Sequence, residues 1–191
     1  MNKPWFSNHF CSGAKEFEFS NSMRLLWEQH VYWTRMTVNS IAFELPDEEP
    51  VTARLLQNAT DMGDSLRPFY GNRIAGKYGS LIRDHLVVAA ELVIAARDGD
   101  QRAAADARRR WFINGEEISE FVSKINPFIS REEFQEMFFE HLELTELEAV
   151  LILQQNFRRS IAVFDEIERQ ALDMADTLTK AIVKQFPKKF K

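Results

Sequence analysis

The sequence is poor in cysteine and glycine. One cysteine, Cys11, occurs among 191 residues, so an internal disulfide and a metal site built from several thiolates are both excluded. Only seven glycines occur, and neither G-x-x-x-x-G-K-[ST] nor G-x-G-x-x-G, the loop patterns that hold phosphates, is found. No serine or cysteine stands in a nucleophile motif. The sequence therefore gives no support for nucleotide binding or for nucleophilic hydrolysis.

Long apolar runs and an excess of positive charge are also missing. No segment approaches the roughly 20 apolar residues that span a bilayer, and the first residues lack the apolar core of a signal peptide. The formal net charge is −5, which gives no general attraction to nucleic acid or anionic lipid. We therefore expect a cytoplasmic protein with neither a nucleic acid nor a membrane as its partner.

Hydrophobic and aromatic residues, by contrast, are abundant. Hydrophobic residues make up 45% of the chain and include sixteen Phe and four Trp. A chain of this length buries a sizeable core as a single domain. The apolar residues recur at spacings of three and four, the period of an amphipathic helix, and no segment alternates as a strand does. The sequence therefore predicts an all-α fold.

Breaks in this period divide the chain into helices. Proline and glycine interrupt it at Pro46 and Pro50, in the stretch RPFYGN, at Gly99 and in the stretch NPF. A single helix over 131–186 would be unusually long for a compact domain, so we expect a break at 154–157. The helices are predicted at about 20–43, 51–65, 73–97, 101–125 and 131–186.

The predicted architecture is an up-down, antiparallel four-helix bundle with one or two accessory helices. Residues 21–187 would form this single domain, after an irregular N-terminal arm at 1–20 and before a solvated basic tail at 188–191. The Asn-Gly pair at 114–115 is also a tight-turn signal, but we expect the helix to continue through Gly115.

Three of the four histidines, His30, His85 and His141, lie on the apolar stripes of three different predicted helices. At about 1.5 Å of rise per residue, His85 and Asn114 lie at one level, because they are almost equally far from the turn at 98–100. The same count from the next turn brings His141 to the level of Asn114. His30 joins them if the short helix crosses the end of the bundle, and misses them by about 8 Å if it runs the full length back.

A layer of three imidazoles with a fourth position open is an arrangement that binds Zn²⁺ or another divalent transition metal. Glu148 lies on the stripe of His141, where a carboxylate must be paired, protonated or bound to a cation. The Glu-x-x-His pattern of di-iron bundles is absent, so no carboxylate-bridged pair of ions is expected. The candidate ions are Zn, Fe and Mn, with redox or hydrolytic chemistry and no residue assigned a catalytic role. The candidate ligands are His30, His85, His141, Glu148 and Asn114.

A second interpretation makes the histidines ordinary core residues, each hydrogen-bonded to a Tyr, Thr or Asn side chain. The chain would then be a non-enzymatic structural or interaction protein. An organic ligand in the bundle core and a proton relay through coupled histidines are further alternatives. The last helix carries apolar residues through which it would form a homo-oligomer: Phe164, Ile167, Leu172, Leu178 and Ile182.

Several stretches carry a resemblance to other proteins: LLWEQHVYWTRM, LRPFYG, INPF, FFEHLELTE and FDEIERQALDMAD. In these the chain, from residue 20 onward, resembles a group of short uncharacterised bacterial proteins built as helical bundles. Some similar sequences carry the label acetylglutamate kinase, but the glycine-rich phosphate loops of that enzyme do not occur here. The H-x-x-W pair on the first helix, followed by later helical histidines, is similar to metal-containing bundles of the ferritin-like or hemerythrin-like kind. This resemblance implies a metal near His30, His85 and His141, although core carboxylates are scarce.

Overall fold

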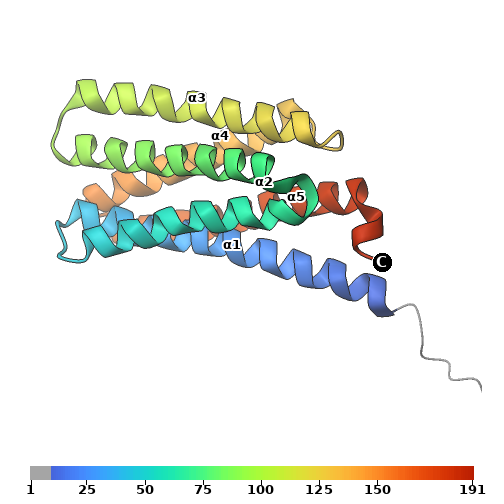
Figure 1. The fold of residues 1–191 in the computed structure, drawn as a ribbon. Helices are drawn as coiled ribbons and strands as arrows, with labels where there is room; N and C mark the ends of the chain where they lie inside the picture. The colour runs from blue at the N-terminus through green and yellow to red at the C-terminus, as the bar shows by residue number, and fades with distance from the viewer. Residues whose placement is uncertain (1–9) are drawn as a thin grey trace, which may run out of the picture.

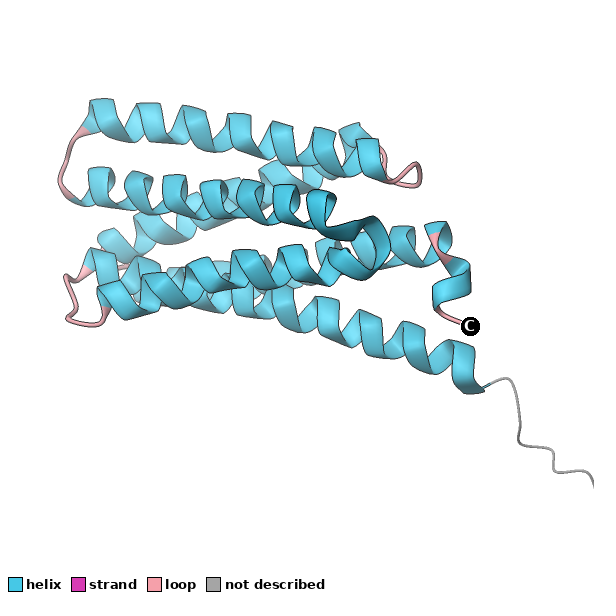
Figure 2. Cartoon of the chain, viewed as in Figure 1, coloured by secondary structure: helices cyan, strands magenta, loops and turns pink. Residues whose placement is uncertain are grey.

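The computed structural model describes residues 10–191, and every regular element within them is helical (Figures 1 and 2). The all-α prediction is thus confirmed. None of the described helices is both long and apolar enough to cross a membrane. The elements are α1 (Phe10–Ala42), α2 (Glu48–Arg97), α3 (Gln101–Ile125), α4 (Arg131–Leu153), α5 (Phe157–Gln185) and a 3₁₀ turn (Pro187–Lys189).

The longest helix, α2, changes direction in its middle. Gly71 has φ 76° and ψ 174°, a conformation that glycine adopts without the steric cost of a Cβ. It divides α2 into a first segment, 48–70, and a second segment, 72–97, which run in opposite directions (Figure 1). The break in RPFYGN was therefore predicted correctly. The first segment, however, is longer than the predicted helix at 51–65 and runs back along α1.

Six antiparallel helical segments form three hairpins that pack around a large hydrophobic core and a second, smaller cluster. The hairpins are α1 with the first segment of α2, the second segment of α2 with α3, and α4 with α5 (Figure 1). Contacts of α1 with α5 and of α3 with α4 join neighbouring hairpins. The predicted four-helix bundle is not confirmed, because the first segment of α2 is a full member of this arrangement and not an accessory helix.

The two segments of α2 approach each other closely at two glycines. A Cβ added to Gly63 would lie 2.8 Å from the carbonyl oxygen of Ala75, and one added to Gly79 would lie 3.1 Å from that of Ala59. Both of these neighbouring atoms belong to the backbone, which cannot rotate away from an added Cβ as a side chain could. Glycine at these positions therefore sets the distance between the two hairpins that α2 connects.

The ends of the chain differ from the prediction. Residues 10–20, expected to be irregular, are the first turns of α1, and the rest of the predicted arm, 1–9, lies outside the described residues. The lysines of the tail are exposed, but Phe190 is buried. Its ring centroid lies 5.5 Å from those of Phe19 and Phe69, so the tail is packed onto the bundle and is not a free solvated end.

The predicted interior boundaries agree with the structure. α4 ends at Leu153 and α5 begins at Phe157, where the break was expected. α3 is continuous through Gly115, against which the ring of Phe138 packs. Of the five apolar residues through which the last helix was predicted to pair with another copy, four are buried in this chain's own core: Phe164, Ile167, Leu178 and Ile182. These four side chains are therefore not exposed to a second copy.

Candidate metal centre

Three histidines meet at the centre of the bundle. His30 on α1, His85 on the second segment of α2 and His141 on α4 are each no more than 3% exposed. One ring nitrogen from each lies within 4.8 Å of the other two. The ring centroid of His30 is 6.1 Å from that of His85 and 5.8 Å from that of His141. Each hairpin thus contributes one histidine to a single layer.

An amide side chain of the same hairpin fixes each ring. Nδ1 of His30 lies 3.2 Å from Oδ1 of Asn58, whose Nδ2 donates to the carbonyl oxygen of Leu26 at 3.0 Å. Because the amide nitrogen is committed to that carbonyl, the amide oxygen faces the ring and accepts a hydrogen bond. Nδ1 of His30 therefore carries the proton, and the lone pair lies on Nε2.

The other two hairpins repeat this arrangement. The ring of His85 bonds to Asn114 at 3.2 Å, and the ring of His141 bonds to Gln170 at 3.1 Å, again through Nδ1. The two amide nitrogens donate to backbone carbonyls one turn before each histidine. The hydrogen bonds of these rings within residues 10–191 all use Nδ1, so Nε2 of each ring keeps a free lone pair and is the nitrogen available to a shared ligand.

Burial keeps the three rings neutral. It lowers the pKa of His30 to about 4 and, together with repulsion from His30, that of His141 to about 3, each against the smaller opposing effect of the ring's amide partner. Burial lowers the pKa of His85 well below its usual value, and repulsion from the other two histidines adds to the effect. At neutral pH the layer therefore presents three unprotonated nitrogens, the form in which imidazole binds a metal.

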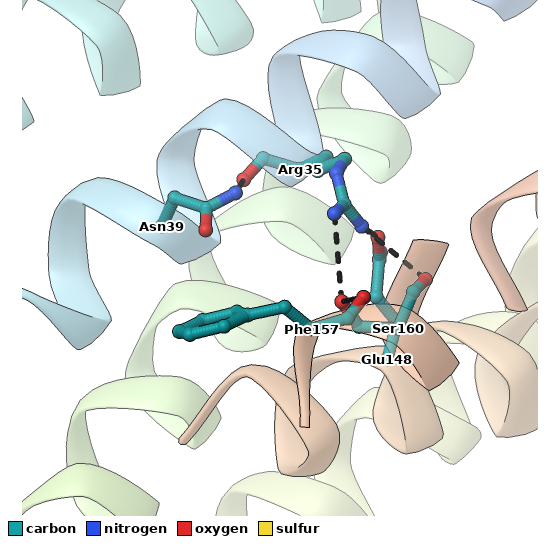
Figure 3. Close-up of polar contacts among 5 residues, drawn as sticks. All are labelled: Arg35, Asn39, Glu148, Phe157 and Ser160. Carbon is teal, nitrogen blue, oxygen red and sulfur yellow. Dashed lines mark hydrogen bonds and ion pairs between the residues drawn. The ribbon is translucent and has the colours of Figure 1, made fainter. Parts of the chain in front are cut away.

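Glu148 does not join this layer. Its carboxylate pairs with the guanidinium of Arg35, which also reaches the carbonyl oxygen of Ser160 at 3.4 Å (Figure 3). Burial raises the pKa of Glu148 to about 7, against the opposing effect of Arg35. Glu148 lies outside the layer because it is two helical turns beyond His141, about 10 Å along the axis. Of the five candidate ligands, only the three histidines come together, and Asn114 holds a histidine instead of facing the centre.

The level of His30 was left open by the sequence and is settled by the longer first segment of α2. That segment does run back along α1, an arrangement predicted to place His30 about 8 Å from the level of the other histidines. Asn58 lies thirteen residues before Gly71 and His85 fourteen after it, so both are at one level. His30 bonds to Asn58 and is therefore at the level of His85. The expected 8 Å displacement was wrong because it assumed a shorter helix.

Two residues that hold the rings, Asn58 and Gln170, were not predicted. Asn58 lies on the helix predicted to be accessory, and Gln170 lies on the last helix, where the sequence predicts a role for the apolar residues alone. The sequence nevertheless contains a signal. Asn58, Asn114 and Gln170 are spaced 56 residues apart, and each follows a histidine by 28 or 29 residues.

Comparison with known proteins gives no relative: no family model, curated protein or solved structure matches this chain. The geometry of the histidine layer is accordingly the basis of the functional proposal that follows.

Proposed function

We propose that the chain binds one divalent transition metal ion through Nε2 of His30, His85 and His141. The observation that carries the proposal is the convergence of three neutral, amide-fixed imidazoles, with one nitrogen of each within 4.8 Å of the others. A hydrogen bond from the second ring nitrogen to an oxygen is the usual support of a metal-binding histidine, because it fixes both tautomer and orientation.

Zn²⁺ fits this ligand set best among the candidate ions. Three imidazoles without a carboxylate favour Zn²⁺ or Fe²⁺ over Mn²⁺, which prefers oxygen ligands. Nitrogens bound at about 2.0–2.1 Å in a tetrahedral site lie about 3.3 Å from one another. The three converging ring nitrogens, now within 4.8 Å of one another, would have to approach by no more than about 1.5 Å.

A three-histidine set leaves one position of a tetrahedral ion open. Zinc sites with an open position bind water there and lower its pKa to about 7, which makes hydroxide available at neutral pH. The proposed centre therefore supports Lewis-acid or hydrolytic chemistry when it holds Zn²⁺. Redox chemistry would require iron or copper in the same place.

The rival function is a structural protein whose histidines are only hydrogen-bonded. The three amide bonds satisfy Nδ1 of each ring, as that interpretation requires. It leaves unexplained why three buried imidazoles, each with an unpaired Nε2, are gathered within 4.8 Å of one another, because acceptors without a donor repel each other. A metal ion supplies the missing positive charge.

Elemental analysis of protein purified without an affinity tag tests the proposal. We expect about one equivalent of zinc in the wild type and less than a tenth in His85→Ala. His85→Gln keeps most of the side-chain volume and is expected to lose the metal as well. Ile82→Ala is the matched control, because it removes a fully buried side chain three residues away without removing a ligand. Zinc retained by both His85 variants, or a folded wild type that takes up none from solution, refutes the proposal and favours the structural rival.

A further inference from the structure

A cavity of about 220 Å³ lies beside the histidine layer, among α1, α2, α3 and α4. Three of its lining residues, Thr34, Ala89 and Thr145, each follow a layer histidine by four residues. Trp111, which stacks on the ring of His85 with centroids 5.3 Å apart, also lines it. The cavity therefore begins one helical turn from the three imidazoles.

The two sides of the layer are filled differently. Trp27, Ile82 and Phe138, each three residues before a histidine, are large and no more than 2% exposed. The residues four positions after the histidines are Thr, Ala and Thr. Packing thus closes one side of the layer and leaves space on the other. None of the three histidines lines the cavity itself, so a fourth ligand of a bound metal would reach it from the cavity past Thr34, Ala89 and Thr145.

The charge of the centre restricts what that ligand is. Three neutral imidazoles leave both positive charges of a divalent ion uncompensated in a buried, apolar place. Glu148, the nearest carboxylate on the same stripe, is occupied by Arg35. An anionic fourth ligand offsets one of these two charges, as hydroxide does at a zinc site that holds no other anion.

Two polar atoms on lining residues point to the same chemistry. Oγ1 of Thr37 and Nε1 of Trp111 are buried and have no hydrogen-bond partner within residues 10–191. Buried groups of this kind are usually paired. Nε1 of Trp111 can only donate, so the partner it lacks is an acceptor, whereas the hydroxyl of Thr37 can donate or accept.

The mouth of the cavity lies between α3 and α4. Arg108 and Glu146 line the cavity, both side chains reach solvent, and Nε of Arg108 donates to a carboxylate oxygen of Glu146 at 2.8 Å. The remaining lining is mainly Ala, Val, Leu and Ile. An ion pair therefore covers a hydrophobic interior.

We infer that this cavity binds a small molecule with an apolar body and one anionic end, and that the anionic end takes the fourth position on the metal. The inference rests on the proposed function for its metal but not for its apolar cavity. The size agrees, because a dry cavity of about 150 Å³ already holds benzene. A single aromatic ring that bears a carboxylate, phenolate or thiolate is the class of ligand that fits.

Cobalt-substituted protein tests the anionic end, because its visible spectrum reports a change of ligand. We expect benzoate to shift the spectrum and to bind at least tenfold more tightly than acetate. Ala149→Leu fills the cavity two turns from His141 and should abolish that preference, leaving acetate binding and cobalt content unchanged. Ala103→Leu, an exposed residue of α3 outside the lining, is the matched control and should behave as wild type. Equal affinities for benzoate and acetate, or a preference that survives in Ala149→Leu, overturn the inference.

Metal-free protein tests the apolar cavity separately. We expect toluene to raise the thermal unfolding temperature of the wild type and of Ala103→Leu, but not of Ala149→Leu. If cobalt does not bind, the proposed function and the anionic end both fail, and a toluene effect then supports the apolar cavity alone. If cobalt binds and toluene has no effect on any variant, the cavity is refuted while the metal centre stands.

Discussion

At the scale of the residue, each histidine of the layer is held by an amide side chain that makes two hydrogen bonds. The amide oxygen accepts from Nδ1 of the ring, and the amide nitrogen donates to a carbonyl on the helix of that histidine. Neither a carboxylate nor a hydroxyl does both in this geometry, because a carboxylate has no donor and a hydroxyl is too short. The amide therefore fixes the tautomer and the orientation of the ring together.

Removal of one amide should weaken metal binding without removing a ligand. We expect Asn58→Ala to lower zinc affinity about 10- to 100-fold, because His30 loses both its orientation and the acceptor of its Nδ1 proton. Competition with a chromogenic chelator measures the change. Asn39→Ala is the control, because Asn39 lies on the helix of His30 and its side chain, among the described residues, bonds to the carbonyl oxygen of Arg35 alone. An affinity equal to that of the wild type in Asn58→Ala would mean that the amide has no part in metal binding.

Counting along the helices predicted the histidine layer but not its surroundings. Distance along an axis follows from the rise per residue, so His85, Asn114 and His141 were placed at one level from their turns alone. Which neighbour a side chain faces depends on helix rotation and lateral packing, which a single stripe does not specify. Glu148 was for this reason assigned to the metal, although it lies closer to Arg35 on another helix.

At the scale of the element, α2 joins two hairpins through one glycine with positive φ and one close helix contact. The position of the break followed from the sequence, because proline and glycine mark it. The length and direction of the first segment did not follow, because its apolar period is weak and predicts a helix that ends at residue 65. The contact at Gly63 and Gly79 explains why the two segments lie against each other.

This contact predicts opposite effects for two glycine substitutions in α2. Gly63→Ala should destabilise the protein by about 1–3 kcal/mol, because the new Cβ would lie 2.8 Å from the carbonyl oxygen of Ala75. Gly76→Ala should leave stability unchanged or raise it by up to about 1 kcal/mol, because no atom lies within 4 Å of its Cβ and alanine is the better helix former. Urea unfolding measures both. A Gly63→Ala variant as stable as Gly76→Ala would show that the segments do not pack this closely.

At the scale of the whole molecule, three hairpins of similar length surround one axis. Each supplies one histidine, one amide and one backbone carbonyl at the same level, and the amides recur at intervals of 56 residues. No single hairpin brings two imidazoles together. The layer forms only when all three hairpins are assembled, so its protonation and its ligands are coupled to unfolding of the entire bundle.

This coupling fixes the direction in which pH changes the stability of the metal-free protein. The unfolded chain binds protons at its histidines below pH about 6.5, whereas the folded chain does so only near pH 4 at His30 and near pH 3 at His141. The unfolded state therefore holds more protons between those values, and stability falls as the pH falls through 6.5. Glu148 acts in the opposite direction, because its pKa is raised from 4.5 to about 7 and its contribution is lost as the pH rises.

The histidine effect is best measured in Glu148→Gln, where the opposing carboxyl is absent. We expect the free energy of unfolding of the chelator-treated variant to fall by several kcal/mol between pH 7 and pH 4.5, since one pKa unit corresponds to about 1.4 kcal/mol for each group. Urea unfolding at half-unit intervals of pH provides the measurement. Adding His30→Gln should reduce the fall by about a third, because one of three similar groups is removed. A free energy that is constant over this range, or an equal fall with and without His30, would show that the imidazoles are not held neutral by burial.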